Sequence, residues 1–175
     1  MTNRASLLTV RSIEAVIDAI GRAASWVALL IIVLMTCNVL LRYTFNYGTV
    51  WGQELEWHLM GALILFGMSY ASLKDGHVRV DLFYAHYSKK TKLLVDVLSL
   101  LLQIGICCVI IWLSMNYVEQ SYSIGEISAD PGGLPYRWAI KALLPIGFTL
   151  LLIQSIGELL RLCMCNQEKS EETHA

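Results

Sequence analysis

The sequence predicts an all-α integral membrane protein, a four-helix bundle of transmembrane segments. Of the 175 residues, 56% are hydrophobic and only 15% are charged, whereas roughly one quarter of an average soluble domain is charged. Four stretches contain no Asp, Glu, Lys or Arg, and they cover residues 23–41, 57–73, 97–118 and 142–157. No stretch remains that could form a soluble domain of its own.

The four apolar stretches differ in how easily they cross a membrane. Their lengths are 19, 17, 22 and 16 residues, and a helix needs roughly 20 residues to cross a hydrocarbon core of about 30 Å. The first and third suffice, whereas the second and fourth borrow residues from their flanks. We therefore expect a domain of residues 23–165 with spans at about 23–43, 53–74, 93–118 and 137–162.

Residues 1–22 precede the first span and carry too many charges for a cleavable signal peptide. Their apolar side chains recur at helical spacing and their charges fall on the other side, which predicts a short amphipathic helix along the inner membrane face. The apolar positions are Ile13, Val16, Ile17 and Ile20, and the charged ones are Glu14, Asp18 and Arg22. The polar tail, residues 166–175, is expected to be disordered.

The orientation follows from Lys and Arg, which cells retain on the cytoplasmic side. With both termini inside, ten of these residues lie in cytoplasmic segments and three on the opposite side. We expect a multi-pass protein of the bacterial inner membrane with cytoplasmic N and C termini. Its basic inner loop attracts anionic lipid headgroups through Lys89, Lys90 and Lys92, and nothing indicates a nucleic-acid partner.

The stretch 51–59, WGQELEWHL, opens the second span with three ionisable side chains. On a helix Glu54 and His58 lie one turn apart and share a face, whereas Glu56 lies about 200° around. A hydrogen-bonded Glu54–His58 pair turned toward protein avoids the free energy of exposing these groups to lipid.

Three other roles would each need more than this stretch supplies. A zinc site would find at most two ligands in the E-x-x-x-H spacing, because His77, His86 and His174 are predicted to be cytoplasmic. A haem would need a histidine at mid-span, and a proton relay would need a continuing chain of ionisable groups. Neither is present in the sequence, so we expect no metal, no cofactor and no enzymatic activity.

Other residues indicate architecture. Trp51, Trp57 and Trp138 are expected to anchor the outer ends of the helices in the membrane interface. Gly67 and Ala71 would let another backbone approach closely. Pro135 suits the first turn of the fourth helix, and Pro145 lies inside that helix, where a kink or a packed, tilted helix is expected.

Three motifs resemble a known family. They are W-x-x-E-L at residues 51–55, GMSYASLKDGHVRVD at 67–81 and LPYRWAIKALLPIGF at 134–148. Together with the length and the four spans, they resemble the small membrane subunit of TRAP transporters, the DctQ-like family. The resemblance covers residues 15–160.

The resemblance implies a subunit of a tripartite uptake system for carboxylate-bearing solutes. A periplasmic binding protein would deliver substrate to a large membrane subunit, which would hold the substrate site and use the sodium gradient. The small subunit would bind the large one and extend its stationary scaffold. The family's signature falls here on residues expected to be architectural or at the interface: Glu54, Gly76, His77, Asp81, Pro135, Pro145 and Gly147.

The chain departs from the family pattern at two places. Gln53-Glu54 stands where many members have two acids, which puts in doubt any role that needs a carboxylate pair. Arg137 and Lys141 add charge before the fourth span. They could dock the binding protein by steering its encounter, or they could snorkel beside the outer headgroups.

Two other classes of function stay open at this point. Four-helix units of this kind could oligomerise into a self-sufficient small channel or carrier. Alternatively, the chain could anchor a redox complex in the membrane. A subunit of a larger transporter should copurify with a partner of about a dozen spans, a channel should pass ions alone, and a redox anchor should bind haem or quinone.

Overall fold

The computed structural model of the protein describes residues 2–74, 84 and 86–174, and among them the side chains of residues 10–74, 84, 86–88 and 90–164. These residues form the helices α1 (Thr2–Phe45), α2 (Val50–Leu73), α4 (Lys89–Ser123) and α5 (Arg137–His174). No strand occurs in this described part of the chain. The predicted all-α fold is confirmed.

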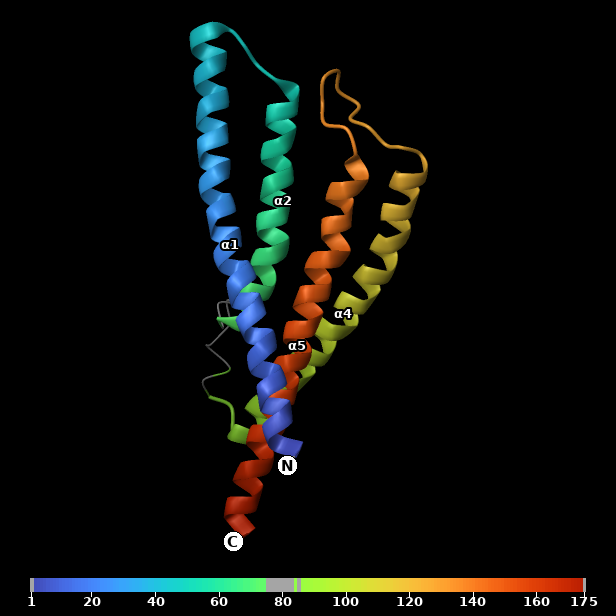
Figure 1. Cartoon of the computed structure of the whole chain (residues 1–175). Coiled ribbons are helices and arrows are strands. Elements are labelled where there is room, and N and C mark those ends of the chain that lie inside the picture. The colour runs from blue at the N-terminus through green and yellow to red at the C-terminus, as the bar shows by residue number, and fades with distance from the viewer. Residues whose placement is uncertain (1, 75–83, 85, 175) are drawn as a thin grey trace.

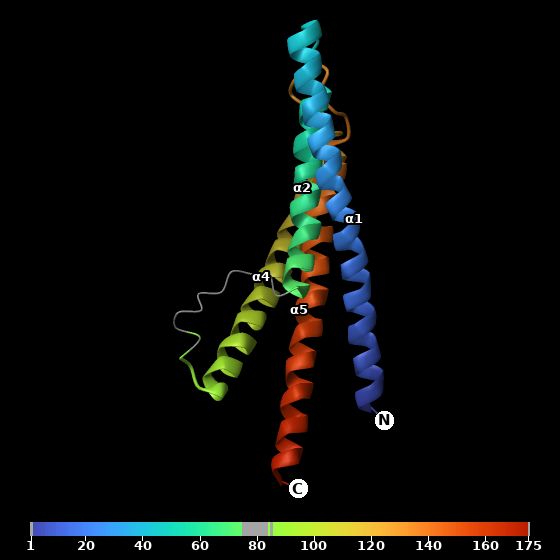
Figure 2. The ribbon, with the colours of Figure 1, turned by 90° about the vertical axis from the view of Figure 1, so that its left-hand side faces the viewer.

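The helices lie side by side in the order α1, α2, α5, α4, and α4 packs mainly on α5. The 46–49 connection and the 124–136 loop lie at one end, which we call the loop end, and both termini lie at the opposite, terminal end (Figure 1). Figure 2 shows that the layer is thin at the loop end, whereas α4, α5 and α1 fan out toward the terminal end. The bundle is therefore flattened, and it has two broad faces.

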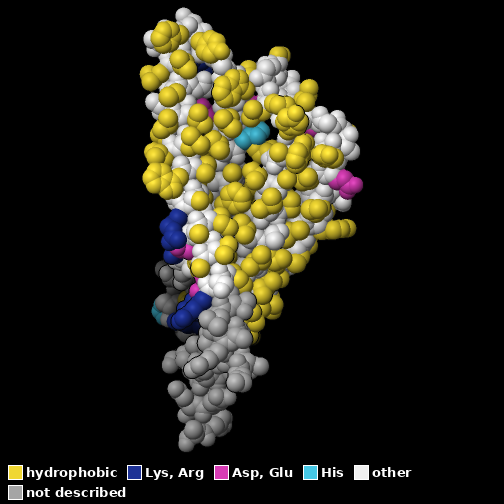
Figure 3. All heavy atoms as spheres, viewed as in Figure 1, with side chains coloured by type: hydrophobic (Ala, Val, Ile, Leu, Met, Phe, Trp, Pro, Cys, Tyr) yellow, Lys and Arg dark blue, Asp and Glu magenta, His cyan; other side chains and the backbone are white. Residues whose placement is uncertain are grey.

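Three described helices are long and apolar enough to cross a membrane, over Val10–Phe45, Lys90–Ser123 and Arg137–Met164. The second predicted span corresponds to α2, whose 24 residues extend about 36 Å. Its length suffices, but Glu54, Glu56 and His58 lower its mean hydropathy. Hydrophobic side chains cover most of the face in Figure 3, and charged ones are sparse across its middle. The second crossing stays a prediction.

Residues 2–22 are helical, but they do not form a separate short helix. The helix runs without a break into the first span, because the chain offers no proline there and a single glycine does not end a helix. Part of its apolar side packs inward, since Val10 and Ile17 are buried, whereas Val16 is exposed. Ile13 lies 4.0 Å from the position of a Cβ added at Gly157 of α5.

The tail also differs from the expectation of disorder, because α5 continues to His174. Residues 166–174 contain Gln, Glu and Lys, which favour helices, and no proline or glycine that would stop one. The helix also passes through Pro145, where the Thr149 hydroxyl donates a hydrogen bond to the Pro145 carbonyl at 2.6 Å. The expected kink at Pro145 stays a prediction.

Glycines set the closest contacts between helices. A Cβ added at Gly21 of α1 would lie 2.7 Å from the Cβ of Tyr70 on α2 and nearer still to its ring. A Cβ added at Gly147 of α5 would lie 2.7 Å from the Cβ of Leu65 and 3.1 Å from its carbonyl oxygen. Contacts this short exclude any larger side chain at either position. Gly147 therefore has an architectural role within the chain, between α2 and α5.

Candidate functional site

Glu54 lies in the first turns of α2 at the loop end, and only 3% of its surface is exposed. Its carboxylate accepts a hydrogen bond from the Ser128 hydroxyl, one from the Leu134 N–H at 2.6 Å and one from the Arg137 guanidinium at 3.0 Å. Burying a carboxylate without such partners would cost several kcal/mol. We call these four residues the Glu54 clamp; it joins α2 to the 124–136 loop and to α5.

The loop backbone is shaped to meet Glu54. The Ser128 N–H donates to the Leu134 carbonyl at 3.3 Å, and the Gly133 N–H donates to the Asp130 carbonyl at 3.0 Å. A Cβ at Gly133 would lie 2.7 Å from the Glu54 Oε2 atom, so only glycine fits there. Gly132 has a φ of 81°, which glycine adopts at little cost. The turn chemistry of residues 130–133 therefore serves a buried contact.

A second ion pair closes the α4 side of the loop. The Glu126 carboxylate contacts the Lys141 ammonium and accepts a hydrogen bond from the Ser121 hydroxyl at 2.7 Å. The Lys141 ammonium also lies 4.0 Å from the centre of the Tyr117 ring. The hydrogen bonds from Lys141 and then Ser121 hold the pKa of Glu126 below its ordinary value. This pair joins α4, the loop and α5.

The structure thus places both predicted docking cations in contacts within the chain. Arg137 pairs with Glu54, and Lys141 pairs with Glu126. The Lys141 side chain is only 14% exposed. Their charges stabilise the loop end, and neither cation stands free at its surface.

The predicted Glu54–His58 side-chain pair is absent. His58 Nδ1 contacts the backbone carbonyl oxygen of Glu54, because the Glu54 carboxylate is held by the loop and by Arg137. Glu56 accepts a hydrogen bond from the Asn38 amide of α1 at 3.3 Å. The two acids therefore face different neighbouring elements, as the helical geometry predicts.

The remaining predicted residues divide into three groups. Pro135 is exposed and lies two residues before α5, not in its first turn. The reason is Tyr136, whose φ of 62° is left-handed and not helical. A Cβ at Gly67 would meet no atom within 4 Å. Gly76, His77 and Asp81 lie outside the described residues.

The three predicted anchors lie toward the loop end of their helices. Trp51 and Trp57 of α2 are exposed, the latter by 70%. Trp138 of α5 is half-buried and packs edge-on against Tyr122, with ring centres 5.5 Å apart. Indole rings at this level are typical of a membrane–water interface.

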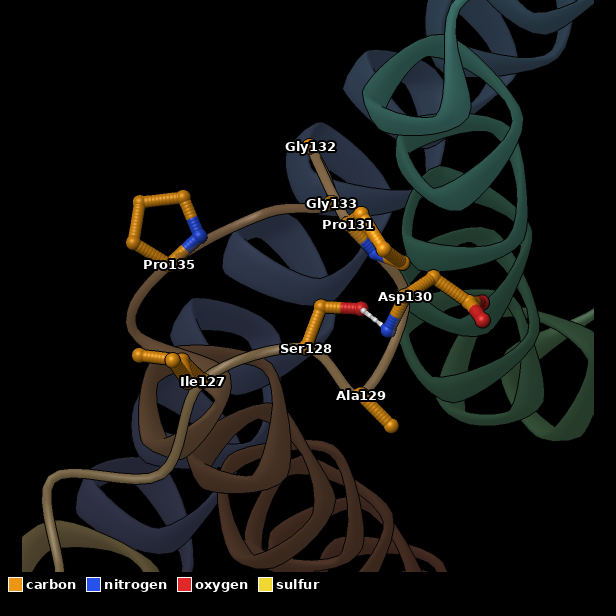
Figure 4. A pocket seen from close by; sticks show the side chains of 8 residues that line it. All are labelled: Ile127, Ser128, Ala129, Asp130, Pro131, Gly132, Gly133 and Pro135. Atoms are coloured by element: carbon orange, nitrogen blue, oxygen red, sulfur yellow. Dashed lines mark hydrogen bonds between the residues drawn. The ribbon is translucent and has the colours of Figure 1, made fainter.

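The outward side of the loop is hollowed. Residues 127–133 together with Pro135 line a space of about 320 Å³ (Figure 4). Ile127, Asp130 and Pro131 are exposed. The Ser128 hydroxyl accepts a hydrogen bond from the Asp130 N–H at 3.2 Å (Figure 4). The Asp130 carboxylate forms no ion pair with any residue that the structure describes.

Comparison with known proteins identifies the family. Residues 31–164 match the family described as tripartite ATP-independent periplasmic transporters, DctQ component. Over 121 residues, the chain is 26% identical to the "C4-dicarboxylate TRAP transporter small permease protein DctQ" of Pseudomonas aeruginosa. The aligned region covers 68% of this chain and 57% of that relative's length.

The match includes residues 31–45 of α1, all of α2 and α4, the Glu54 clamp and most of α5. The chain is a component of the bacterial inner membrane, with helices that suit a membrane crossing. It is not an enzyme. The protein belongs to the DctQ component family of the tripartite ATP-independent periplasmic transporters.

Proposed function

We propose that the chain is the small scaffold subunit of a sodium-coupled TRAP transporter. It associates with a large membrane subunit, which carries the substrate and uses the sodium gradient, and it helps dock a periplasmic binding protein. The substrates are organic acids or related carboxylate-bearing solutes, in keeping with the C4-dicarboxylate named for the Pseudomonas aeruginosa relative. Both termini face the cytoplasm, and the loop end faces the periplasm.

The observation that carries the scaffold role is the flattened layer with its uncovered apolar faces. A free face runs along α2 and comprises Trp57, Met60, Ile64, Gly67 and Ala71. The large side chains of Trp57, Met60 and Ile64 are each more than half exposed. These positions recur at helical spacing on one side. Gly67 and Ala71 lie one turn apart, which allows close approach of a second helix. We assign this face to the large subunit.

A pair of matched substitutions tests this assignment. A Cβ added at Gly67 or at Gly105 meets no described atom within 4 Å, so we expect Gly67→Leu and Gly105→Leu to leave the contacts within the chain intact. Gly105 lies on α4 between the exposed Leu101 and Val109, which already keep another backbone at a distance. We expect Gly67→Leu to reduce copurification with the large subunit by about tenfold, equivalent to 1.4 kcal/mol. Gly105→Leu should leave it unchanged.

Copurification also separates the proposal from its alternatives. The scaffold role predicts a stable complex with a partner of about a dozen spans, and substrate uptake by proteoliposomes only when all three components are present. Transport by proteoliposomes that contain this chain alone would refute the proposal in favour of a channel or carrier. Bound haem or quinone in the purified chain would favour a redox anchor.

A further inference from the structure

Two cations and one acid meet where two charge-free stretches of the chain end. Asp18 of α1 forms ion pairs with Arg22, one turn further along α1, and with Lys74, which follows α2 and lies 2.8 Å away. Arg22 directly precedes the charge-free residues 23–41, and Lys74 directly follows the charge-free residues 57–73. A membrane span gives way to polar residues at the level of the lipid headgroups, so we place these three residues, the Asp18 cluster, at that level.

The Asp18 cluster carries more positive than negative charge. Arg22 and Lys74 contribute two positive charges, and Asp18 compensates one of them. The side chains of Arg22 and Lys74 are 68% and 54% exposed. A guanidinium has five N–H donors and an ammonium has three, and among the described residues these two cations form ion pairs only with Asp18. N–H donors therefore remain for an anion outside the chain.

Close packing of α1 on α2 brings the two cations together. The Lys74 ammonium lies 5.5 Å from the centre of the Tyr70 ring. The Tyr70 side chain packs on Gly21, which directly precedes Arg22, and a Cβ added at Gly21 would lie 2.7 Å from the Cβ of Tyr70. Cations that are positioned in advance lose less side-chain entropy when they bind an anion, so more of the contact energy appears as affinity.

Apolar surface extends from the cluster toward the loop end. Trp26 lies one turn beyond Arg22 on the same side of α1, and Leu29 and Val33 continue this line at helical spacing. Trp26 is 72% exposed, and Leu29 and Val33 are about half exposed. Figure 3 shows the same transition on one face of the molecule, where charged side chains lie at the end of a broad hydrophobic surface. A headgroup at the cluster would place its acyl chains along this surface.

We propose that the Asp18 cluster binds the phosphodiester of an anionic phospholipid of the phosphatidylglycerol type. The Arg22 guanidinium and the Lys74 ammonium donate hydrogen bonds to the phosphate oxygens, a geometry that suits both groups. The single negative charge of this lipid matches the excess charge of the cluster. Phosphatidylethanolamine fits less well, because its own ammonium compensates its phosphate.

The source of this ligand is the membrane in which the chain resides. Phospholipid phosphates line both sides of a bilayer, so the inference holds for either orientation of the chain. It goes beyond the proposed scaffold and docking roles and does not depend on them. Failure of the large subunit to copurify would refute those roles and leave the lipid site standing.

The test measures lipid binding to the full chain, purified in detergent and stripped of lipid, by native mass spectrometry. The unmodified chain should bind one phosphatidylglycerol about tenfold more tightly than phosphatidylcholine or phosphatidylethanolamine, and added salt should weaken this preference. Arg22→Gln and Lys74→Gln should each weaken phosphatidylglycerol binding by about fivefold, as expected of one basic residue beside an anionic membrane surface. Each single variant leaves Asp18 paired with one cation, so the contact between α1 and α2 is kept.

Lys90→Gln is the matched control. Lys90 is another exposed cation, near the start of α4 at the terminal end, and it forms no ion pair with the cluster. Its substitution should change the affinity by less than about twofold, as expected of a separate, screened charge. Arg22→Lys keeps the charge and should lose less affinity than Arg22→Gln.

Three outcomes would overturn the inference. The first is equal affinity of the unmodified chain for phosphatidylglycerol and phosphatidylcholine, a comparison that needs no variant. The second is unchanged phosphatidylglycerol binding in both Arg22→Gln and Lys74→Gln. The third is displacement of the lipid by millimolar inorganic phosphate, which would show that the cluster takes a free anion and that the apolar surface beside Trp26 holds no acyl chain.

Discussion

The loop end and the terminal half of the molecule are held together by different interactions. At the loop end, carboxylates meet cations: the Glu54 side chain is only 4% exposed, and that of Glu126 is 26% exposed. In the terminal half, Gly21 packs tightly against Tyr70, and Ile13 lies within ordinary van der Waals distance of a Cβ added at Gly157. The ion pairs there are open to solvent, since the Lys74 side chain paired with Asp18 is 54% exposed.

This difference teaches where charge contributes to the fold. An exposed ion pair stabilises a protein by at most about 1 kcal/mol, whereas a buried charge left without its partner is strongly destabilising. The 124–136 loop has little apolar side-chain surface to bury, so carboxylate contacts position it. The terminal half has long helices that can pack closely along their lengths. Substitutions should therefore destabilise the two regions through different interactions, lost charge pairing at the loop end and disturbed packing in the terminal half.

The largest effect is expected from Glu54→Ala, which leaves the Arg137 guanidinium and the Leu134 N–H without their acceptor. Little folded chain should be recovered in detergent, and assembly with the large subunit should fall far more than substrate preference changes. The measurements are the yield on size-exclusion chromatography and the substrate profile of the surviving complex. Glu56→Ala, which loses only the Asn38 contact, is the matched control.

A double substitution sharpens the prediction for Glu54. Glu54→Gln combined with Arg137→Gln removes both charges, so no buried charge is left without a partner, and part of the yield should return. Normal complex yield for Glu54→Ala together with altered substrate choice would contradict the architectural role. An additive loss in the double variant would show that the two residues do not act as a pair.

An intermediate effect is expected from Gly147→Leu, because even a Cβ added at Gly147 would lie only 2.7 Å from the Cβ of Leu65. Overpacking of this kind costs about 1–3 kcal/mol, and it should lower the midpoint of thermal unfolding in detergent. Gly105→Leu faces open space, so its stability should stay within about 0.5 kcal/mol of the unmodified chain. Equal stability of the two variants would exclude close packing of α2 on α5.

The smallest effect concerns pH and Glu126. Lys141 and Ser121 lower the pKa of Glu126 in the folded chain, so its ionised form adds stability above its unfolded pKa of about 4.3. That contribution is lost as the pH falls through the lower, folded pKa. The unfolding midpoints of the unmodified chain and Glu126→Gln should therefore differ at neutral pH and converge in acid. A difference that does not change with pH would contradict this linkage.

Much of the fold could be predicted from composition and periodicity. The charge-free stretches locate the first span, α4 and α5, because a helix that crosses lipid has to be apolar over its length. The 51–59 stretch was correctly predicted to belong to α2, because the charge-free part of α2 is by itself too short to cross a membrane. The predicted separate helix before the first span is not seen, because α1 runs from Thr2 to Phe45 without a break.

The candidate site was predicted only in part. Glu54 stands out as an acid beside an apolar stretch, and Arg137 and Lys141 stand out as cations before the fourth span. Ser128 and the Leu134 N–H give no signal in the sequence, because a serine and a backbone amide are common everywhere. Neither alternative for the two cations, docking or snorkelling, included their pairing with Glu54 and Glu126.

The sequence by itself determined that this is a helical membrane protein, roughly where its helices lie and that both termini share one end, because lipid imposes a length and a polarity on every crossing segment. Only the tertiary structure decided that α5 lies between α2 and α4, and which acid meets which cation. Those pairings join residues as far apart as Glu54 and Arg137. They depend on the backbone path of a short loop, which neither hydropathy nor helical periodicity describes.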